Sequence, residues 1–410
     1  MNKNEKTDWM SILQLVFSFM VLLFFLGAAV LLAANAELFS APELTGMSPG
    51  SLSVLTCAFA ALALLNLPSV ISSIHKLAGA GKSRNAHIGG PRPEKKAGVL
   101  TWLPLPLFGA ALAGLYFLPV HMPNRELWVG VLAALGAVLP ALWLLRVGSG
   151  GLWGGFARRH AGLLSFSIGF TTYFILILEI ALVLALGAGL ALAASANPSL
   201  LSKLGELWRA LQTSGADAEA LQASLLEFAR SPLVLALAFG MVALALPALE
   251  EGFKTLGVWL LSDRKISPAE GYVAGLFSGA GFALVEALLN SAQLAGGSPA
   301  EWLSFLLGRF GGTLLHTFNG GLMGWALARS WQDKRRGKTT GVFLLALLVH
   351  AMWNGAALAN VFFGGQGESG LPGYLPMILL SIVLMVVFLL FTRRVHRSGA
   401  GEPEGGLSSS

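Results

Sequence analysis

Long stretches without a charged residue restrict this chain to a membrane fold. Residues 10–34 and 373–392, for example, contain no Asp, Glu, Lys or Arg. The hydrocarbon core of a bilayer is about 30 Å thick and is crossed by about 20 apolar residues in a helix. In lipid, every backbone N–H and C=O must be bonded within the protein, so such runs fold as helices. The sequence therefore predicts an all-α protein, a polytopic bundle of transmembrane helices.

Composition agrees with a membrane protein and excludes other classes. Charged residues make up 12% of the 410 residues and hydrophobic ones 55%, whereas a soluble domain has about 25% charged residues. The net charge of +6 does not indicate nucleic acid, because the basic residues lie between the apolar runs, where they set membrane topology. We expect the lipid bilayer as a partner and no nucleic acid. The single cysteine, Cys57, excludes an intrachain disulfide and a cysteine-ligated metal site.

About ten apolar runs are long enough to span a bilayer. They cover residues 10–34, 51–75, 98–118, 127–147, 162–195, 233–261, 268–292, 302–328, 340–362 and 373–392. Alternate connecting segments, together with the two ends, hold 21 of the 27 basic residues. Basic loops stay on the cytoplasmic side. Ten spans with both termini in the cytoplasm place every basic loop on that side. We therefore expect a multi-pass protein of the plasma membrane, such as a bacterial inner membrane.

The spacing of these runs divides the chain into four segments. Residues 1–97 are expected to form an N-terminal two-helix membrane unit and a basic cytoplasmic linker, and residues 98–161 the third and fourth spans. Residues 162–392 are expected to form the functional core, which includes an outer loop at 196–232 with two short amphipathic stretches. The Gly-, Ser- and Glu-rich segment 393–410 is expected to be a disordered cytoplasmic tail.

Glycines repeat at every fourth position in the seventh span, at Gly271, Gly275 and Gly279. Gly320 and Gly324 have the same spacing in the eighth span. Small residues at this spacing let membrane helices approach closely. The pattern predicts that these two helices lie at the centre of the bundle.

Ionisable residues within the spans are the strongest functional signal. A charge in the bilayer costs about 2.5–3.5 kcal/mol on insertion scales, so each one is a candidate for function. Eight lie well inside the spans, and all but Glu179 fall in four consecutive helices. These seven are Glu250, Glu251, Lys254, Glu286, Arg309, His316 and His350. Arg309 and Glu179 are interpreted as structural, each pairing with a neighbour or with an interfacial group.

Helical spacing groups these residues on shared faces. Glu250 and Lys254 are four apart and can pair. Pro247 precedes them and should free a backbone carbonyl, because proline has no N–H to donate. His350 and Asn354 share one face of the ninth span. If the helices pack in sequence order, all of these groups surround one polar site.

Two kinds of chemistry fit such a site. Two histidines and a carboxylate make a three-ligand site for a catalytic divalent metal, with zinc as the first choice, and a further carboxylate can act as the general base on water. Asn354 can donate a hydrogen bond to an oxyanion. Buried carboxylates with histidines are also typical of proton-coupled transporters. Residue spacing alone leaves catalysis and transport both open.

The motifs resemble those of a known family, the PrsW family of intramembrane proteases. The segment Glu250-Glu251-Gly-Phe-Lys254 resembles its E-E-x-x-K motif, and Phe282-Ala-Leu-Val-Glu286 resembles its F-x-x-x-E motif. His316 and the segment His350-Ala-Met-Trp353-Asn354 resemble its two histidine-bearing segments. The wider superfamily includes the CAAX prenyl proteases and bacteriocin-processing enzymes, whose E-E-x-x-x-R motif has its Arg one position later than Lys254 and which have His where this chain has Glu286. The resemblance covers roughly residues 165–392.

The resemblance implies proteolysis of a membrane-anchored protein or peptide. It implies Glu250 or Glu251 as the base, with Lys254 tuning the pair and Asn354 as a lesser oxyanion donor. Glu286, His316 and His350 are then expected either to bind the metal or to position the water in a metal-independent mechanism. A proton-coupled transporter, or an inactive scaffold on the same fold, stays an alternative.

The depth of the site predicts where cleavage occurs. Glu250 lies 14 residues before the cytoplasmic Arg264, which is about 21 Å along a helix. His350 lies 12 residues after Lys338, or about 18 Å. In a core of about 30 Å, both fall in the middle or the outer half. We therefore expect cleavage near the extracytoplasmic boundary.

Overall fold

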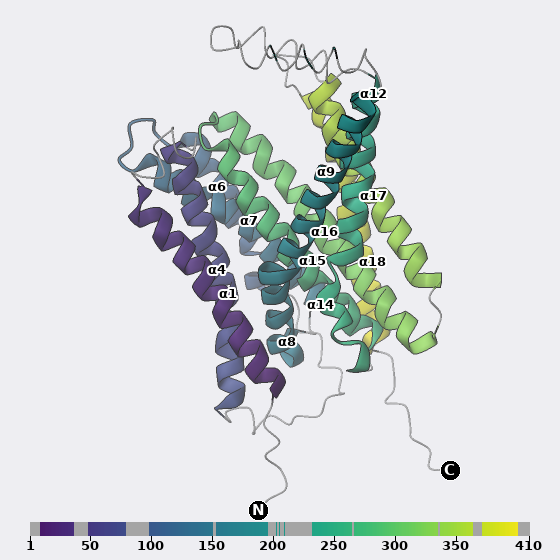
Figure 1. Cartoon of the computed structure of the whole chain (residues 1–410). Helices are drawn as coiled ribbons and strands as arrows, with labels where there is room; N and C mark the ends of the chain where they lie inside the picture. The colour runs from purple at the N-terminus through teal and green to yellow at the C-terminus, as the bar shows by residue number, and fades with distance from the viewer. Residues whose placement is uncertain are drawn as a thin grey trace, which may run out of the picture. The chain divides into compact units, whose positions relative to one another are not determined.

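All regular structure in the described part of the chain is helical, as predicted (Figure 1). The computed structural model describes residues 9–36, 48–78, 98–150, 153–195, 202, 205, 209, 232–264, 266–334, 337–363 and 371–400. The predicted outer loop 196–232, most of the linker that ends at residue 97, and residues 401–410 of the predicted tail lie outside the described residues, apart from residues 202, 205, 209 and 232. The longer α-helices are α1 (Trp9–Ala34), α4 (Pro49–Leu77), α6 (Pro104–Phe117), α7 (Arg125–Ser149), α8 (Trp153–Phe166), α9 (Thr172–Ser195), α15 (Pro268–Ser291), α16 (Pro299–Asp333), α17 (Gly337–Phe363) and α18 (Leu371–Ala400).

Nine helical stretches of the described chain are long and apolar enough to cross a membrane. They correspond to nine of the ten predicted spans. The predicted span 302–328 belongs to α16, which has 35 residues and is therefore about 52 Å long. It falls short on apolar content rather than on length, because it carries Arg309, His316 and Asn319. The location of both termini in the cytoplasm stays a prediction.

The chain divides into two compact units. The first unit is formed by residues 1–172, 254–343 and 381–410, and the second by residues 173–253 and 344–380. The helices α17 and α18 each contribute to both. The four-segment division made from the sequence stays a prediction, and α18 continues to Ala400, into the segment expected to be a disordered tail.

At the centre of the first unit, α15 packs along α16 (Figure 1). The glycines allow the backbones to touch. A Cβ on Gly275 would lie 2.0 Å from the Gly320 carbonyl oxygen, and one on Gly271 would lie 2.4 Å from that of Gly324. Of the most apolar stretch of α15, 89% is buried within the protein. The predicted close approach of these two helices is confirmed.

We expect Gly275→Ala to destabilise the protein. The added methyl group has no space because backbone atoms of α16, which cannot rotate away, occupy its position. Inserting carbon into a well-packed core costs typically about 1–3 kcal/mol. The melting temperature of the purified protein in detergent should therefore fall.

The matched control is Gly109→Ala in α6, where a new Cβ meets no atom within 4 Å. Its melting temperature should stay at the wild-type value or rise slightly, because alanine favours the helix more than glycine does. Equal effects of the two substitutions would contradict the close contact of α15 and α16.

A buried polar network joins the N-terminal helices to α8. Ser165 donates to Asn66 over 2.5 Å and to Ser18 over 3.0 Å, and Ser18 lies 2.7 Å from the Ser69 hydroxyl. All four residues are buried. Hydrogen bonds between polar side chains hold membrane helices together where water is absent. The first two spans are thereby bound to the same unit as α15 and α16.

Candidate active site

The sixth predicted span is not one continuous helix. It consists of α12 (Pro232–Ala238), a π-helical segment η4 (Phe239–Ala245), α13 (Leu246–Phe253) and α14 (Leu256–Trp259). In a π-helix each backbone N–H donates to the carbonyl five residues earlier. In η4 the Leu246 N–H donates in this way to the Met241 carbonyl. Pro247 is next and has no N–H for the Val242 carbonyl. The Asn354 amide of α17 donates to that carbonyl over 2.9 Å.

This contact explains how the sequence positions part of the site. The predicted effect of Pro247, a freed backbone carbonyl, is present at Val242. Asn354 satisfies it, so α17 is attached to the π-helical segment that directly precedes α13, the helix that carries Glu250. Single π-helical turns are frequent at functional sites. Asn354 has a second amide hydrogen, which the Val242 carbonyl does not use.

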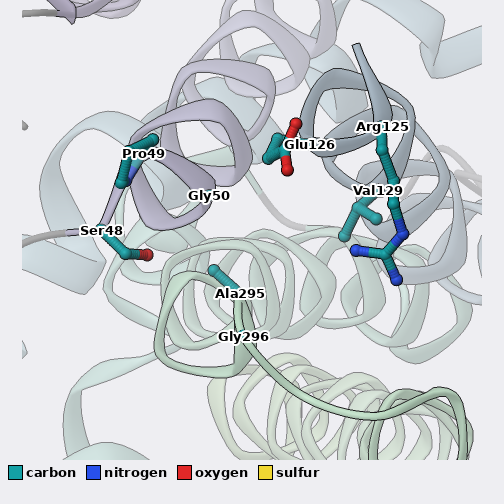
Figure 2. Close-up of a pocket in the computed structure, with 8 residues that line it drawn as sticks. All are labelled: Ser48, Pro49, Gly50, Arg125, Glu126, Val129, Ala295 and Gly296. Carbon is teal, nitrogen blue, oxygen red and sulfur yellow. The ribbon is translucent and has the colours of Figure 1, made fainter. Parts of the chain in front are cut away.

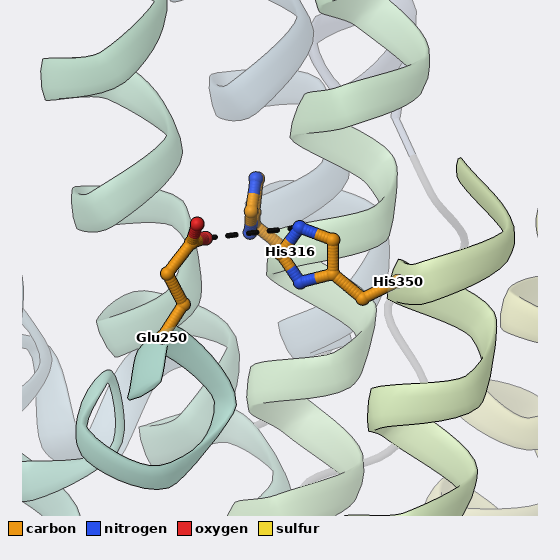
Figure 3. Close-up of side chains that lie close together, drawn as sticks. All are labelled: Glu250, His316 and His350. Atoms are coloured by element: carbon orange, nitrogen blue, oxygen red, sulfur yellow. Dashed lines mark ion pairs between the residues drawn. The ribbon is translucent and has the colours of Figure 1, made fainter. Parts of the chain in front are cut away.

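In the second unit, His350 lies between the two adjacent glutamates. Its Nδ1 is 2.8 Å from Oε1 of Glu251, and its Nε2 is 3.7 Å from Oε2 of Glu250. Figure 3 shows the pair formed by Glu250 and His350. The side chains of Glu251 and His350 are 0% and 2% exposed, and that of Glu250 is 12% exposed. An ionised carboxylate only accepts hydrogen bonds, so Nδ1 carries the proton in the bond to Glu251.

The two glutamates contact different nitrogens of His350. Glu251 is hydrogen-bonded to Nδ1, the kind of contact that carboxylates make with histidines that bind metals. Nε2 of His350 then faces the Glu250 carboxylate across 3.7 Å, which is too long for a hydrogen bond. Zn–N and Zn–O bonds add to about 4.0–4.3 Å, so one ion can touch both atoms. The donor atoms of this pair fit a zinc ion.

In the first unit, a chain of ionic contacts runs from α16 to α15 and back. The Arg309 guanidinium contacts both carboxylate oxygens of Glu286, at 3.1 Å and 2.7 Å. Oε2 of Glu286 is also 3.0 Å from Nε2 of His316. With Nε2–H directed at Glu286, Nδ1 of His316 carries the lone pair.

The F-x-x-x-E spacing has a clear structural role here. Phe282 and Glu286 are one helical turn apart on α15, and both contact His316. The Phe282 ring lies 4.9 Å from the imidazole, and Glu286 binds its Nε2. His316 itself is 3% exposed. Together the two side chains fix the ring of His316 in one orientation.

Lys254 lies where the sixth span is interrupted, between α13 and α14. Its side chain is fully buried, and its carbonyl accepts a hydrogen bond of 2.5 Å from Ser278 of α15. Ser278 in turn accepts at its own carbonyl from Ser167, in the π-helical segment Ser167–Thr171. The predicted ion pair of Lys254 with Glu250 or Glu251 stays a prediction.

The structure distributes the predicted site residues between the two units. The second unit contains Glu250, Glu251, His350 and Asn354, and the first contains Lys254, Glu286 and His316. Within each unit, the histidine is bonded to a glutamate from another helix. Sequence reasoning classed Arg309 as structural and missed its contact with Glu286. The i, i+3 and i, i+4 spacings along one helix gave no signal for it, because the partner lies on another helix.

The fold and these side chains together define a class, a multi-pass membrane protein with histidine–carboxylate pairs inside its helices. Comparison with known families agrees with this class of membrane protein. Residues 182–391, which are 210 of the 410, match the PrsW family of intramembrane metalloproteases. The chain belongs to this family and is therefore a membrane-embedded protease. Searches of curated proteins and of solved structures gave no match.

Proposed function

We propose that the chain cleaves membrane-anchored proteins or peptides near the extracytoplasmic boundary, with Glu250, His316 and His350 as the metal ligands. Each of these side chains offers one ligand atom. His316 belongs to the first unit and the other two residues to the second. The family match supports this combination, because residues 182–391 include all three. Two histidines and one glutamate are a known ligand set for catalytic zinc.

The hydrogen-bond pattern of the two histidines carries the proposal. Each ring has one nitrogen directed at a glutamate: Nδ1 of His350 is hydrogen-bonded to Glu251, and Nε2 of His316 lies in ionic contact with Glu286 at 3.0 Å. Each therefore presents its other nitrogen as a lone pair, which is the form that binds a metal. We assign Glu286 to orienting His316 rather than to the metal, because Arg309 and His316 already contact its carboxylate.

The roles of the remaining groups follow from their positions. When bound, zinc supplies Lewis-acid activation of the substrate carbonyl and of water. Glu250 uses its second carboxylate oxygen to accept the proton of the attacking water and to return it to the leaving amine. Asn354 donates its second amide hydrogen to the carbonyl oxygen of the scissile bond. Lys254 is the predicted ion-pair partner of Glu250 or Glu251.

The depth of the histidines supports cleavage inside the membrane. His350 is 13 residues from Gly337, where α17 begins, and so lies about 20 Å along that helix. His316 is 17 residues from either end of α16, or about 25 Å. Both rings are thus near the midpoint of a membrane-crossing length. A substrate has to enter the bilayer region to reach them.

Mapping of the cut site tests the proposal. The purified protein is reconstituted with single-span tagged substrates, and the new termini are identified by mass spectrometry. We expect a cut within the span or within its extracytoplasmic flank. A cut in the cytoplasmic flank, or the same products from the Glu250→Gln protein, would contradict the assignment.

A further inference from the structure

A basic cavity lies at one end of the first unit, away from His316. It has a volume of about 300 Å³ and is formed by the start of α15 and the C-terminal parts of α16 and α18. Two arginines line it, Arg329 of α16 and Arg394 of α18, together with the hydroxyl-bearing residues Ser267 and Ser398. The proposed cleavage chemistry uses none of these residues.

The cavity lies at the boundary of the membrane. One candidate span begins at Pro268, directly after Ser267, and another ends at Ser398. The other end of α15 is 24 residues away, or about 36 Å. The basic segments around residues 329–338 and 393–397 mark this end as cytoplasmic. The cavity is therefore at the depth of lipid headgroups.

Aromatic contacts make the wall of the cavity rigid. Trp325 and Phe391, both lining residues, contact each other with ring centres 5.6 Å apart. Phe391 also contacts Tyr272, whose hydroxyl is 2.7 Å from that of Thr392. The three helices are thus held together beneath the arginines. Tryptophan is enriched at the headgroup level of membranes.

The charges around the cavity leave an excess of positive charge. Nε of Arg329 is 3.0 Å from Asp333, which also contacts Lys338 at 2.9 Å. Hydrogen bonds from Lys338 and Arg329 hold the pKa of the Asp333 carboxyl below its usual value. Glu270 accepts a hydrogen bond from the Ser267 N–H in the cap of α15. Asp333 and Glu270 therefore offset two of the three cations Arg329, Lys338 and Arg394, and one positive charge remains in excess.

A second cavity in the same unit gives a useful contrast. It has about 280 Å³ and lies at the opposite end of α15, beside Ala295 and Gly296 (Figure 2). Its charged residues are one arginine and one glutamate, Arg125 and Glu126, so its lining has no net charge. Of these two cavities, only the basic one has the charge to hold an anion.

We propose that the basic cavity binds the phosphate of an anionic membrane lipid. Arginine binds phosphate through two parallel N–H···O bonds. Basic pockets between membrane helices on the cytoplasmic side are suited to acidic headgroups. The Ser267 hydroxyl accepts from the Glu270 N–H in the helix cap and can donate its own hydrogen to a remaining phosphate oxygen, and the acyl chains extend along the apolar surface of the helices.

Native mass spectrometry of the full chain in detergent tests this proposal. The protein is titrated with phosphatidylglycerol, with phosphatidylcholine as the zwitterionic comparison, and separately with inorganic phosphate. We expect the wild type to prefer phosphatidylglycerol. Arg329→Gln and Arg394→Gln should each weaken its binding roughly fivefold, and both together roughly 25-fold, because one cation near an anionic headgroup contributes about that factor.

Two control variants separate a built site from general attraction. Arg393→Gln removes the same charge from the same helix, but Arg393 does not line the cavity, so binding should be unchanged. Asp333→Asn keeps Arg329 and removes its acidic partner, so binding should be unchanged or tighter. An equal loss in Arg393→Gln and Arg394→Gln, or wild-type preference in the double variant, overturns the site. Binding of inorganic phosphate but not of lipid overturns the lipid assignment.

Discussion

Replacing Glu250 with glutamine is expected to reduce the rate of substrate cleavage by about 10²–10⁴-fold, the usual contribution of a general base. The amide has the shape of the carboxylate but cannot accept the proton of the attacking water. Its side chain is only partly buried, at 12% exposure, and its Oε2 lies 3.7 Å from Nε2 of His350. The fold should therefore tolerate the change, and the loss should appear in kcat, together with a fall in zinc content because Glu250 is also a proposed metal ligand.

The adjacent glutamate provides the sharpest comparison. Glu251→Gln removes the acceptor for Nδ1–H of His350 but leaves the base in place, and such supporting partners typically contribute about 10–100-fold in metal affinity or activity. Added zinc should restore part of the activity in Glu251→Gln and none in Glu250→Gln. Glu179→Gln in α9 controls for the loss of a carboxylate inside a span. If Glu251→Gln is the inactive variant and Glu250→Gln is not, the two roles are reversed.

The helices could be predicted because the bilayer leaves few alternatives. A run such as 10–34 has to form a helix, and α1 covers residues 9–34. The eighth span, 302–328 in α16, is less apolar than the other nine, because the polar residues proposed to carry function lower its apolar content. The π-helical segments Ser167–Thr171 and Phe239–Ala245 had no direct signal. Only Pro247 indicated a local irregularity, and it does so by lacking an N–H.

The residue types of the site were predicted from the sequence, but their partners were not. Spacing shows which side chains share a face of one helix, and it placed Phe282 with Glu286 correctly. Which residue of the next helix they meet depends on the register between helices. On α15 and α16 that register is fixed by contacts such as Gly275 against Gly320. For that reason the sequence did not predict that the Glu286 carboxylate contacts Arg309 and His316, and its assignment to the metal or to positioning the water stays a prediction.

The helices that precede the family match support those that carry the site. The match begins at residue 182, yet α4, α6 and α7 pack against α15 or α16 within the first unit. Val129 and Ala133 of α7, for example, share a buried cluster with Trp302 and Leu306 of α16. We infer that these spans hold α15 and α16 in place. This support is enough to explain why these spans pack where they do, without a role in substrate choice.

Loss of either histidine should remove the metal. We expect the purified wild-type protein to contain about one zinc ion per chain, since structures with three protein ligands and one open position are typical of catalytic zinc. His316→Ala and His350→Ala each delete a ligand from that set. Metal content, measured by inductively coupled plasma mass spectrometry after dialysis, should fall close to zero in both. Cleavage should fall to the level of the Glu250→Gln protein.

Glu286→Gln distinguishes a ligand from a residue that orients one. If Glu286 only directs His316, the glutamine variant should still bind zinc, with an affinity lowered about 10–100-fold, and saturating zinc should restore its metal content. Arg309→Gln should act in the same direction, because Arg309 contacts both oxygens of Glu286. Complete and irreversible loss of zinc in Glu286→Gln would make Glu286 a ligand. Full cleavage activity in protein stripped of metal by a chelator would instead leave Glu250 as the base of a metal-independent protease, with both histidines positioning the water.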